Sequence, residues 1–257
     1  MRRPWLWALV QRHFYPALGY AQATHTIDTV AELSARETFD YLCDRLDLRI
    51  VTSGLEHVPT SGRVIVAANH PAGIADGVAL YAALRQIRDD ISLFANRDAI
   101  RAAPNLQEML IPVEWVTSKR TRKRNRETVT HMVRAFKNER LIVMFPSGRL
   151  ARPSWRGLEE RDWTTSLASL ARKYQAPVVP LHIKAHNSWL YYLLYLLNTE
   201  LRDMTLFREL LNKYQHPYWL TIGAPLQVAG DAHQETQRIR DKVLNELARG
   251  LSQAPDT

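Results

Sequence analysis

The residues whose types and spacing best suggest chemistry are His70 and Asp76, which lie six positions apart. A carboxylate that hydrogen-bonds an imidazole fixes its tautomer and stabilises the imidazolium that forms when the histidine takes a proton. The pair could therefore act as a general base. From the residues alone, a structural explanation stands about level: a histidine at a strand end, followed by a first-turn carboxylate that the helix dipole favours. No serine or cysteine nucleophile is placed equally well beside His70, so a substrate would have to supply the hydroxyl that is deprotonated.

The local sequence places this histidine where a strand stops. Residues 63–69 are largely apolar and β-branched, and they predict a buried strand that ends at Asn69. A proline and a glycine then interrupt the pattern, and apolar residues at helical spacing predict a helix over residues 76–87. His70 is thus expected in the loop between a strand and a helix, where functional side chains are commonly held.

A second loop with polar side chains follows the apolar strand predicted at residues 141–145. It reads Phe145-Pro146-Ser147-Gly148-Arg149. Gly148 permits close approach of a backbone, and Ser147 and Arg149 offer hydrogen-bond donors to a phosphate or carboxylate. By itself this sequence is ordinary turn chemistry. Its interest comes from sharing a strand-end position with His70.

A third strand, predicted at residues 91–95, is followed by Asn96 and Arg97. The guanidinium of Arg97 could bind an anion, or it could form an ion pair with Asp98 or Glu114. The residues alone leave both explanations open.

Strands and helices alternate along most of the chain, which is typical of an α/β fold with a central, mostly parallel sheet flanked by helices. The strands are predicted at residues 48–52, 63–69, 91–95, 110–113, 141–145, 178–183 and 218–222. The helices are predicted at residues 26–46 (with Thr26 or Asp28 as N-cap), 76–87, 124–138, 164–174, 188–211 (one helix or a broken one) and 231–249. No linker or repeat forces a second domain, so we expect a single mixed-sheet domain preceded by an N-terminal helical segment.

The composition is that of a globular protein with an excess of positive charge. Of 257 residues, 46% are apolar, and Lys and Arg outnumber Asp and Glu by 34 to 26, a formal net charge of +8. This excess favours anionic partners such as acidic lipid surfaces, phosphorylated substrates, an acidic carrier protein or nucleic acid. The single cysteine, Cys43, excludes an intramolecular disulfide and a multi-cysteine metal site.

Two aromatic segments bear on membrane contact. Residues 1–20 combine arginines with aromatic side chains, which suits the headgroup zone of a bilayer, although a helix packed on the main domain explains them equally well. Residues 188–197 are apolar all round and too short to span a bilayer, and we favour contact with one leaflet over a buried core helix. No cleavable signal and no spanning helix are predicted. We therefore expect a peripheral protein at the cytoplasmic face of the cytoplasmic membrane.

The densest charge cluster is the basic run at residues 119–126. Read alone, such a run could bind nucleic acid. However, no aromatic residue interleaves it for base stacking, and no helix-turn-helix, zinc or RNA-binding signature accompanies it. We therefore disfavour nucleic acid as a partner, and a solvated loop remains the most common fate of such a run.

Together these motifs resemble the glycerolipid acyltransferase family, whose founding activity is the acylation of lysophosphatidic acid. The resemblance runs from about residue 55 to residue 226 and is carried by the His70…Asp76 and Phe145-Pro146-Ser147-Gly148 motifs. Five residues separate His70 from Asp76 where the founding enzymes have four, and Ser147 stands in place of a glutamate. The stretch Val113-Glu114-Trp115 lacks an arginine that those enzymes carry. These departures look like the haemolysin-related and ornithine-lipid-type branch.

The resemblance implies a glycerolipid acyltransferase fold, with an N-terminal helical segment at residues 1–47 and an acyltransferase domain at residues 48–257. It implies an O-acyltransferase that moves a fatty acyl group from an acyl carrier protein or coenzyme A thioester to a hydroxyl of a lysolipid-type acceptor. His70 would be the general base and Asp76 would hold its imidazole, with no acyl-enzyme, no bound cofactor and no metal. The residues expected to bind substrate are Asn69, Asn96, Arg97, Phe145, Pro146, Ser147, Gly148 and Arg149.

The same resemblance gives the basic run a role, because it could attract anionic lipid, the phosphates of coenzyme A or acyl carrier protein. Two other classes of function stay open. A non-catalytic acyltransferase scaffold could bind a membrane surface or nucleic acid, since fold does not fix function. A hydrolase could release the acyl group to water through the same base.

Overall fold

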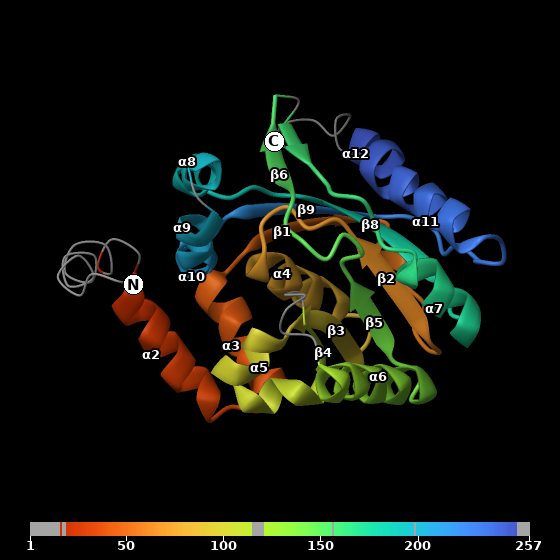
Figure 1. Cartoon of the computed structure of the whole chain (residues 1–257), viewed down its shortest axis with the longest axis horizontal. Coiled ribbons are helices and arrows are strands. Elements are labelled where there is room, and N and C mark those ends of the chain that lie inside the picture. The colour runs from red at the N-terminus through yellow and green to blue at the C-terminus, as the bar shows by residue number, and fades with distance from the viewer. Residues whose placement is uncertain (1–15, 17–18, 115–120, 156, 198, 251–257) are drawn as a thin grey trace.

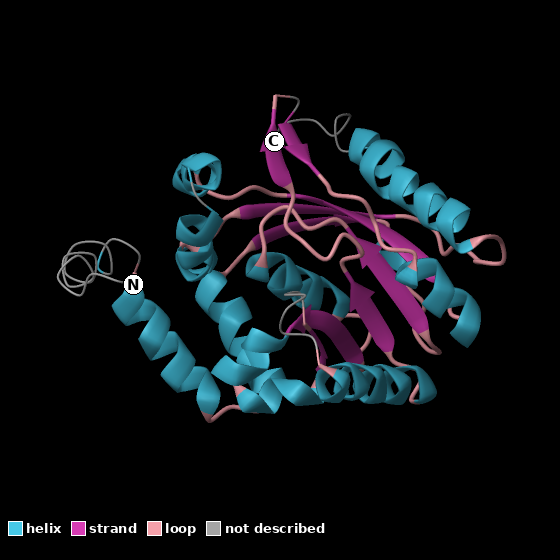
Figure 2. Ribbon diagram, viewed as in Figure 1, coloured by secondary structure: helices cyan, strands magenta, loops and turns pink. Residues whose placement is uncertain are grey.

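The computed structural model describes residues 16, 19–114, 121–155, 157–197 and 199–250 (Figure 1). Within these residues, a central seven-stranded sheet carries helices on both faces, and a short two-stranded hairpin lies outside it (Figure 2). In spatial order the strands of the sheet are β1 (Arg49–Ser53), β9 (Pro217–Ile222), β8 (Val178–Lys184), β2 (Val64–Ala68), β5 (Leu141–Met144), β3 (Ile91–Asn96) and β4 (Leu110–Val113).

The pairing of these strands confirms the expected mostly parallel mixed sheet. Strands β8 and β9 pair antiparallel, and every other neighbouring pair in the sheet is parallel. Each of the seven predicted strands is present, and its two ends lie within one residue of the expected bounds. Short, buried, apolar runs bounded by turn residues are the pattern that parallel strands produce.

Side chains that alternate along the strands build two hydrophobic cores, one on each face of the sheet. On β2, Val64 and Val66 face a core that includes side chains of α3 (Ala35–Leu46) and α4 (Ile74–Leu84). Ile65 faces the opposite core, which is covered by α6 (Arg122–Lys137), α7 (Ser166–Tyr174) and α11 (Ala232–Asp241). This period of two follows from the geometry of a strand, whose successive Cβ atoms point to opposite faces.

The single helix predicted at residues 26–46 is wrong, because the structure has two helices there, α2 (Tyr20–Ala31) and α3. The chain breaks at Ser34, whose side chain accepts the N–H of Glu37 while the Glu37 carboxylate accepts the N–H of Ser34. This capping box starts a new helix. Thr26, predicted as an N-cap, instead lies inside α2 and donates to the Gln22 carbonyl at 2.8 Å. Asp28, the other predicted cap, also lies inside α2.

Of the two alternatives for residues 188–211, the broken helix is confirmed. The described residues of this range form α8 (Trp189–Leu197), α9 (Thr199–Met204) and α10 (Leu206–Leu211). Residues 231–249 form α11, then a π-helical stretch at Lys242–Glu246, then α12 (Leu247–Gly250). In the described residues, no helix is long and apolar enough to cross a membrane.

Five short elements in the described residues are additions that the sequence did not predict. They are the 3₁₀ helices Leu55–His57 and Pro104–Glu108, α5 (Arg97–Ala102), and a hairpin of β6 (Arg152–Ser154) and β7 (Gly157–Glu159). The hairpin extends away from the body of the molecule at the top of Figure 1. It separates the Phe145–Arg149 loop from the buried residue Glu160.

Candidate active site

Two of the polar loops predicted from the sequence meet at one edge of the sheet. Strands β2 and β5 are parallel neighbours, so the residues that follow them emerge side by side. The His70 ring, after β2, stacks on the Phe145 ring, after β5, with ring centroids 4.0 Å apart and planes 18° apart. The two motifs that carried the resemblance therefore share one site.

The His70–Asp76 pair is formed. His70 Nδ1 lies 2.9 Å from Asp76 Oδ2, and the same oxygen accepts the backbone N–H groups of Ala72 at 2.9 Å and Gly73 at 3.0 Å. Because the ionised carboxylate only accepts hydrogen bonds, Nδ1 is the donor and Nε2 is left with a lone pair. The His70 side chain is 20% exposed, whereas Asp76 is fully buried. The buried carboxylate thus holds one ring nitrogen of a partly exposed imidazole.

Gly73 accommodates the extra residue between the histidine and the aspartate. It precedes α4 with φ near 90°, a conformation that L-residues with side chains rarely adopt. A Cβ added there would also approach the Leu150 side chain to 3.3 Å. The turn lets the chain fold back so that Asp76, in the first turn of α4, reaches the imidazole.

Tyr218 on β9 is a neighbour of this pair that the sequence did not single out. Its side chain is fully buried. Burial, and then the nearby charge of Asp76, raise the pKa of the phenol above its ordinary range. Tyr218 therefore stays protonated and can only serve as a neutral donor beside Asp76.

Asn69 lies next to His70, but its side chain faces the neighbouring strand. Its amide nitrogen donates to the Ile183 carbonyl at 2.9 Å, and its amide oxygen accepts the Ile183 N–H at 2.7 Å. Both hydrogen bonds are buried. The Asn69 amide therefore joins the ends of β2 and β8 and fixes the backbone position from which His70 follows. The predicted contact of Asn69 with substrate stays a prediction.

The Phe145–Arg149 loop is held in a tight turn beside His70. The Gly148 N–H bonds the Phe145 carbonyl at 2.9 Å, with Gly148 at φ 61°, and Ser147 Oγ donates to the Arg149 carbonyl at 2.9 Å. Pro146 and Ser147 are buried, whereas the Arg149 side chain is exposed. Of the loop's predicted binding groups, the Arg149 guanidinium is thus the one presented to solvent.

Asn96 and Arg97 have structural partners. The Asn96 side chain accepts the Asp98 N–H and caps α5. Arg97 pairs with Glu127 at 2.7 Å, so the ion-pair partners named from the sequence, Asp98 and Glu114, are both wrong. The structure shows no bond between these two residues and the His70–Asp76 pair, and their predicted contact with substrate stays a prediction.

Glu160 is a residue of this site that the sequence did not reveal. Its carboxylate Oε1 accepts the backbone N–H of His70 at 2.5 Å, and Glu160 is only 7% exposed. Burial raises the pKa of Glu160, against the opposing effect of the hydrogen bond from the His70 backbone N–H. Glu160 follows a hairpin without a hydrophobic pattern, so no sequence signal pointed to it.

Two of the charged or aromatic segments lie partly outside the described residues. Residues 1–15, 17 and 18 are not described, so the expectation for residues 1–20 is untested. In the basic run, residues 119 and 120 are not described, while Thr121 caps α6 by accepting the Arg124 N–H, and the rest of the run lies in the first turns of that helix. In the described residues, no cluster of three or more His, Cys, Asp or Glu side chains could hold a metal ion.

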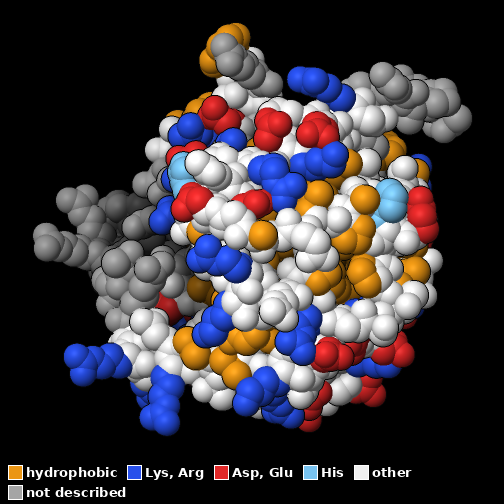
Figure 3. All heavy atoms as spheres, turned by 90° about the vertical axis from the view of Figure 1, so that its right-hand side faces the viewer, with side chains coloured by type: hydrophobic (Ala, Val, Ile, Leu, Met, Phe, Trp, Pro, Cys, Tyr) orange, Lys and Arg blue, Asp and Glu red, His pale blue; other side chains and the backbone are white. Residues whose placement is uncertain are grey.

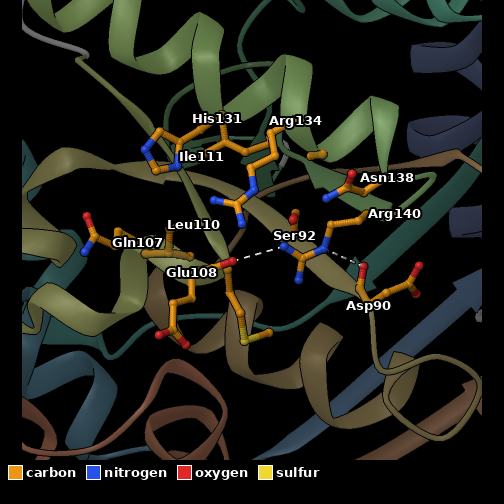
Figure 4. Close-up of a pocket in the computed structure, with 12 residues that line it drawn as sticks. Asp90, Ser92, Gln107, Glu108, Leu110, Ile111, His131, Arg134, Asn138 and Arg140 are labelled. Atoms are coloured by element: carbon orange, nitrogen blue, oxygen red, sulfur yellow. Dashed lines mark hydrogen bonds between the residues drawn. The ribbon is translucent and has the colours of Figure 1, made fainter.

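A cavity of about 340 Å³ lies at the opposite edge of the sheet, near the amino ends of β3, β4 and β5. Figure 4 shows that Arg134, from α6, and Arg140 line it. Arg140 donates to the carbonyls of Asp90, Glu108 and Ile91 at 2.9 to 3.2 Å. None of the predicted site residues lines this cavity.

Comparison with known proteins identifies a family and a similar fold. Residues 49–184 match a family model described as acyltransferase. Two relatives are lyso-glycine lipid O-acyltransferases: one from Phocaeicola vulgatus, 26% identical over 188 residues, and one from Bacteroides thetaiotaomicron, 25% identical over 147 residues. The alignments cover 70% and 57% of this chain, and the chain spans only 65% and 52% of the length of these relatives.

A solved structure with a similar fold is that of the 1-acyl-sn-glycerophosphate (LPA) acyltransferase PlsC from Thermotoga maritima. Its TM-score is 0.55 at 15% sequence identity, with 98% of this chain and 95% of that chain covered. At this identity the likeness establishes the α/β fold. The family model covers more than half of the chain and includes both His70 and the Phe145–Arg149 loop, and the chain therefore belongs to the acyltransferase family.

Proposed function

We propose that this chain is an O-acyltransferase that moves a fatty acyl group from a thioester to a hydroxyl of a lysolipid-type acceptor. The observation that carries the proposal is the formed His70–Asp76 pair, which leaves Nε2 of a partly exposed histidine able to take a proton. The family assignment and the names of the two relatives support the same reaction class.

In the proposed mechanism, His70 Nε2 takes the proton of the acceptor hydroxyl while Asp76 stabilises the imidazolium. The resulting alkoxide attacks the thioester carbonyl and forms a tetrahedral intermediate. Its collapse expels the thiolate, which takes the proton back from His70, so the products are the ester and the free thiol. No acyl-enzyme is required.

The tetrahedral oxyanion needs hydrogen-bond donors. The backbone N–H of Gly148 lies in the loop beside His70, but it is already bonded to the Phe145 carbonyl. It is therefore not available to the oxyanion without a change in the turn. The exposed Arg149 guanidinium is the cation that this loop offers to a phosphate or carboxylate of a substrate.

The names of the relatives guide the choice of acceptor. Because both are lyso-glycine lipid O-acyltransferases, we propose a lysolipid with a free hydroxyl and an amino-acid headgroup as the first acceptor to test, with lysophosphatidic acid as the second. For the donor we propose either an acyl carrier protein or a coenzyme A thioester, and the two are to be supplied in separate assays.

The central experiment is acyl transfer by the His70→Ala variant. Loss of a general base costs roughly 10²–10⁴-fold in rate, so we expect a drop of that size in transfer to each acceptor that the natural protein uses. His233→Ala is the matched control, because His233 is exposed on α11. Full activity of His70→Ala would contradict the mechanism, and fatty acid released without any acceptor would indicate a hydrolase.

We also propose peripheral binding to an anionic membrane surface through α8. Four large apolar side chains lie on one face of this helix, and all four are exposed. They are Trp189, Leu193, Leu196 and Leu197, whose exposed fractions range from 43% to 74%. Such a stripe, on a protein with an excess of positive charge, suits the interface of an anionic bilayer. On the face in Figure 3, by contrast, Lys and Arg are interspersed with Asp and Glu, which does not favour a nucleic-acid track.

Vesicle sedimentation tests this surface. We expect the protein to sediment with phosphatidylglycerol vesicles more than with phosphatidylcholine vesicles, and a Trp189→Ala, Leu196→Ser double variant to lose most of that binding. Tyr214→Ala, which removes an aromatic side chain that is 63% exposed outside α8, is the control. Equal sedimentation of both variants would contradict a role for α8.

A further inference from the structure

The strongest contact at the site that the mechanism leaves unused is the one between Glu160 and His70. Glu160 Oε1 accepts the His70 N–H at 2.5 Å, although the two residues are ninety positions apart in the chain. The bond ties the end of β2 to the residue that leaves the β6–β7 hairpin. A hydrogen bond from an N–H to a buried carboxylate is of the stronger kind.

A second contact, at the start of the hairpin, holds the backbone carbonyl of His70. The Ala151 N–H, just before β6, donates to the His70 carbonyl at 2.9 Å. The hairpin therefore holds both the N–H and the carbonyl of His70, while the imidazole is held separately by Asp76 and Phe145. The backbone contacts fix the position of the His70 main chain, and the contacts with Asp76 and Phe145 fix the orientation of its imidazole.

Charge adds to this geometry. The charge of His70 lowers the pKa of Glu160, against the larger effect of burial. Glu160 also places a carboxylate at the backbone of the residue that becomes cationic when it takes a proton. Asp76, on α4, holds the imidazole directly, and the charge of Asp76 helps to keep the nearby Tyr218, on β9, neutral.

We infer that Glu160 is a positioning residue for His70: its carboxylate fixes the backbone of the general base and supports its protonated form without touching substrate. For acyl transfer this inference rests on the proposed function. The contacts themselves do not depend on which substrate is used.

The first test compares Glu160→Ala and Glu160→Gln in the full-length protein. Glu160→Ala removes the acceptor of the His70 N–H, and we expect kcat to fall by about 10- to 100-fold with little change in KM, because misplacing a reacting group costs up to about that much. Glu160→Gln keeps an oxygen acceptor, so it restores most of kcat. It removes the charge, so the acid limb of the pH–rate profile moves to lower pH.

Glu159→Gln is the matched control. Glu159 is the neighbouring residue, it is about half exposed, and it pairs with Arg152 at 2.8 Å within the hairpin. We expect its kcat and its pH profile to equal those of the natural protein. Melting curves of all three variants separate lost activity from lost folding.

The second test needs no activity. Nuclear magnetic resonance follows the titration of the His70 imidazole, assigned by the signal that His70→Gln removes. We expect the titration midpoint of His70 to move to lower pH in Glu160→Gln and to stay in place in Glu159→Gln. This readout decides the inference even if no acceptor is ever acylated, which would contradict the proposed function alone.

Three results would overturn the inference. The first is that kcat and the pH profile stay unchanged in both Glu160 variants. The second is an effect on KM alone, which would mean that Glu160 binds substrate, and the third is an equal effect of Glu159→Gln and Glu160→Gln on the His70 titration.

Discussion

The two ends of the central sheet hold their loops with charges of opposite sign. At the amino ends of the strands, arginines bind backbone carbonyls: Arg88 donates to Gly62 at 2.5 Å and to Glu139 at 2.7 Å, and Arg140 donates to three more. At the carboxyl ends, acidic side chains bind backbone N–H groups, as Asp76 does at Ala72 and Gly73. Both arrangements satisfy backbone groups that leave the sheet.

The difference agrees with the proposed placement of the chemistry at the carboxyl ends. The Arg88 side chain is 3% exposed, and its guanidinium is bonded to Asp90 and to backbone carbonyls. His70 is 20% exposed, and no described residue hydrogen-bonds its Nε2. The Asp76 carboxylate lies directly against the imidazole, with its Oδ2 2.9 Å from His70 Nδ1. The buried guanidinium of Arg88 is thus bonded within the protein, whereas the buried carboxylate of Asp76 holds a partly exposed imidazole.

The sharpest test of this comparison is Asp76→Asn. The amide is nearly the same size, so the fold should survive, but it no longer holds Nδ1 as the donor. We expect the rate of acyl transfer to fall by roughly 10³–10⁴-fold, the scale of losing the correct tautomer in such a pair. Steady-state kinetics beside a urea denaturation curve measures both properties. A variant that unfolds but keeps its specific rate would reverse our assignment of the two ends.

Arg88→Met is the converse test at the amino ends. It leaves the Gly62 and Glu139 carbonyls without their donor and Asp90 without its partner. Hydrogen bonds to charged groups contribute about 1.5–3 kcal/mol each, so we expect the free energy of unfolding to fall by about 3 kcal/mol. The specific activity of the folded fraction should not change. A large loss of kcat without loss of stability would show that this end contributes to catalysis.

Gly73→Ala acts on the carboxyl ends through the backbone. The residue is held at φ 90° and faces Leu150, so a methyl group strains the turn by about 1–3 kcal/mol. We expect lower stability in urea together with a lower kcat, because the turn sets the distance from Asp76 to His70. Gly157→Ala, with a similar positive φ but open space around it, should lose stability without losing kcat.

The smallest expected effect is on the pH dependence of stability, and its sign differs between the two ends. The pKa of Glu160 is raised in the folded protein by burial, so stability is lost as pH rises above the unfolded value near 4.5 toward the folded one. Glu160→Gln should therefore gain stability over the natural protein as pH rises through this range.

Asp90 at the amino ends behaves in the opposite way. Burial raises its pKa, but the hydrogen bond and charge of Arg88 outweigh burial and lower it. Its contribution to stability is present above the unfolded value near 3.8 and is lost as pH falls. Asp90→Asn should therefore lose stability at neutral pH and converge with the natural protein in acid. Urea midpoints measured from pH 3 to pH 8 test both directions, and equal slopes for both variants would contradict the contrast.

The sequence predicted the sheet and half of the site because both depend on local patterns. Each strand is a short apolar run between turn residues, and His70, Asp76 and the Phe145–Arg149 loop lie beside such runs. The helix break at Ser34 was missed, although Ser34 and Glu37 have the spacing of a capping box and could have predicted it.

The remaining features depend on contacts between distant parts of the chain. Arg97 pairs with Glu127 rather than with Asp98, its neighbour in the sequence, because α6 packs beside β4 and brings Glu127 within reach. The β6–β7 hairpin is short and exposed, so it has no hydrophobic periodicity to detect. Glu160 contacts His70 only after β2, β5 and the hairpin have come together, which no local pattern encodes.

The position of β1 has a consequence for how the protein is made. Within the part of the chain that the structure describes, this edge strand pairs with β9 alone, and its Arg49 lies opposite Pro217, 168 positions later. During synthesis at about 5–20 residues per second, β1 waits on the order of ten seconds or more for a partner. Its exposed Val51 belongs to an open edge of the kind that attracts other strands. Release of the chain before β9 is complete would leave β1 as a template for aggregation.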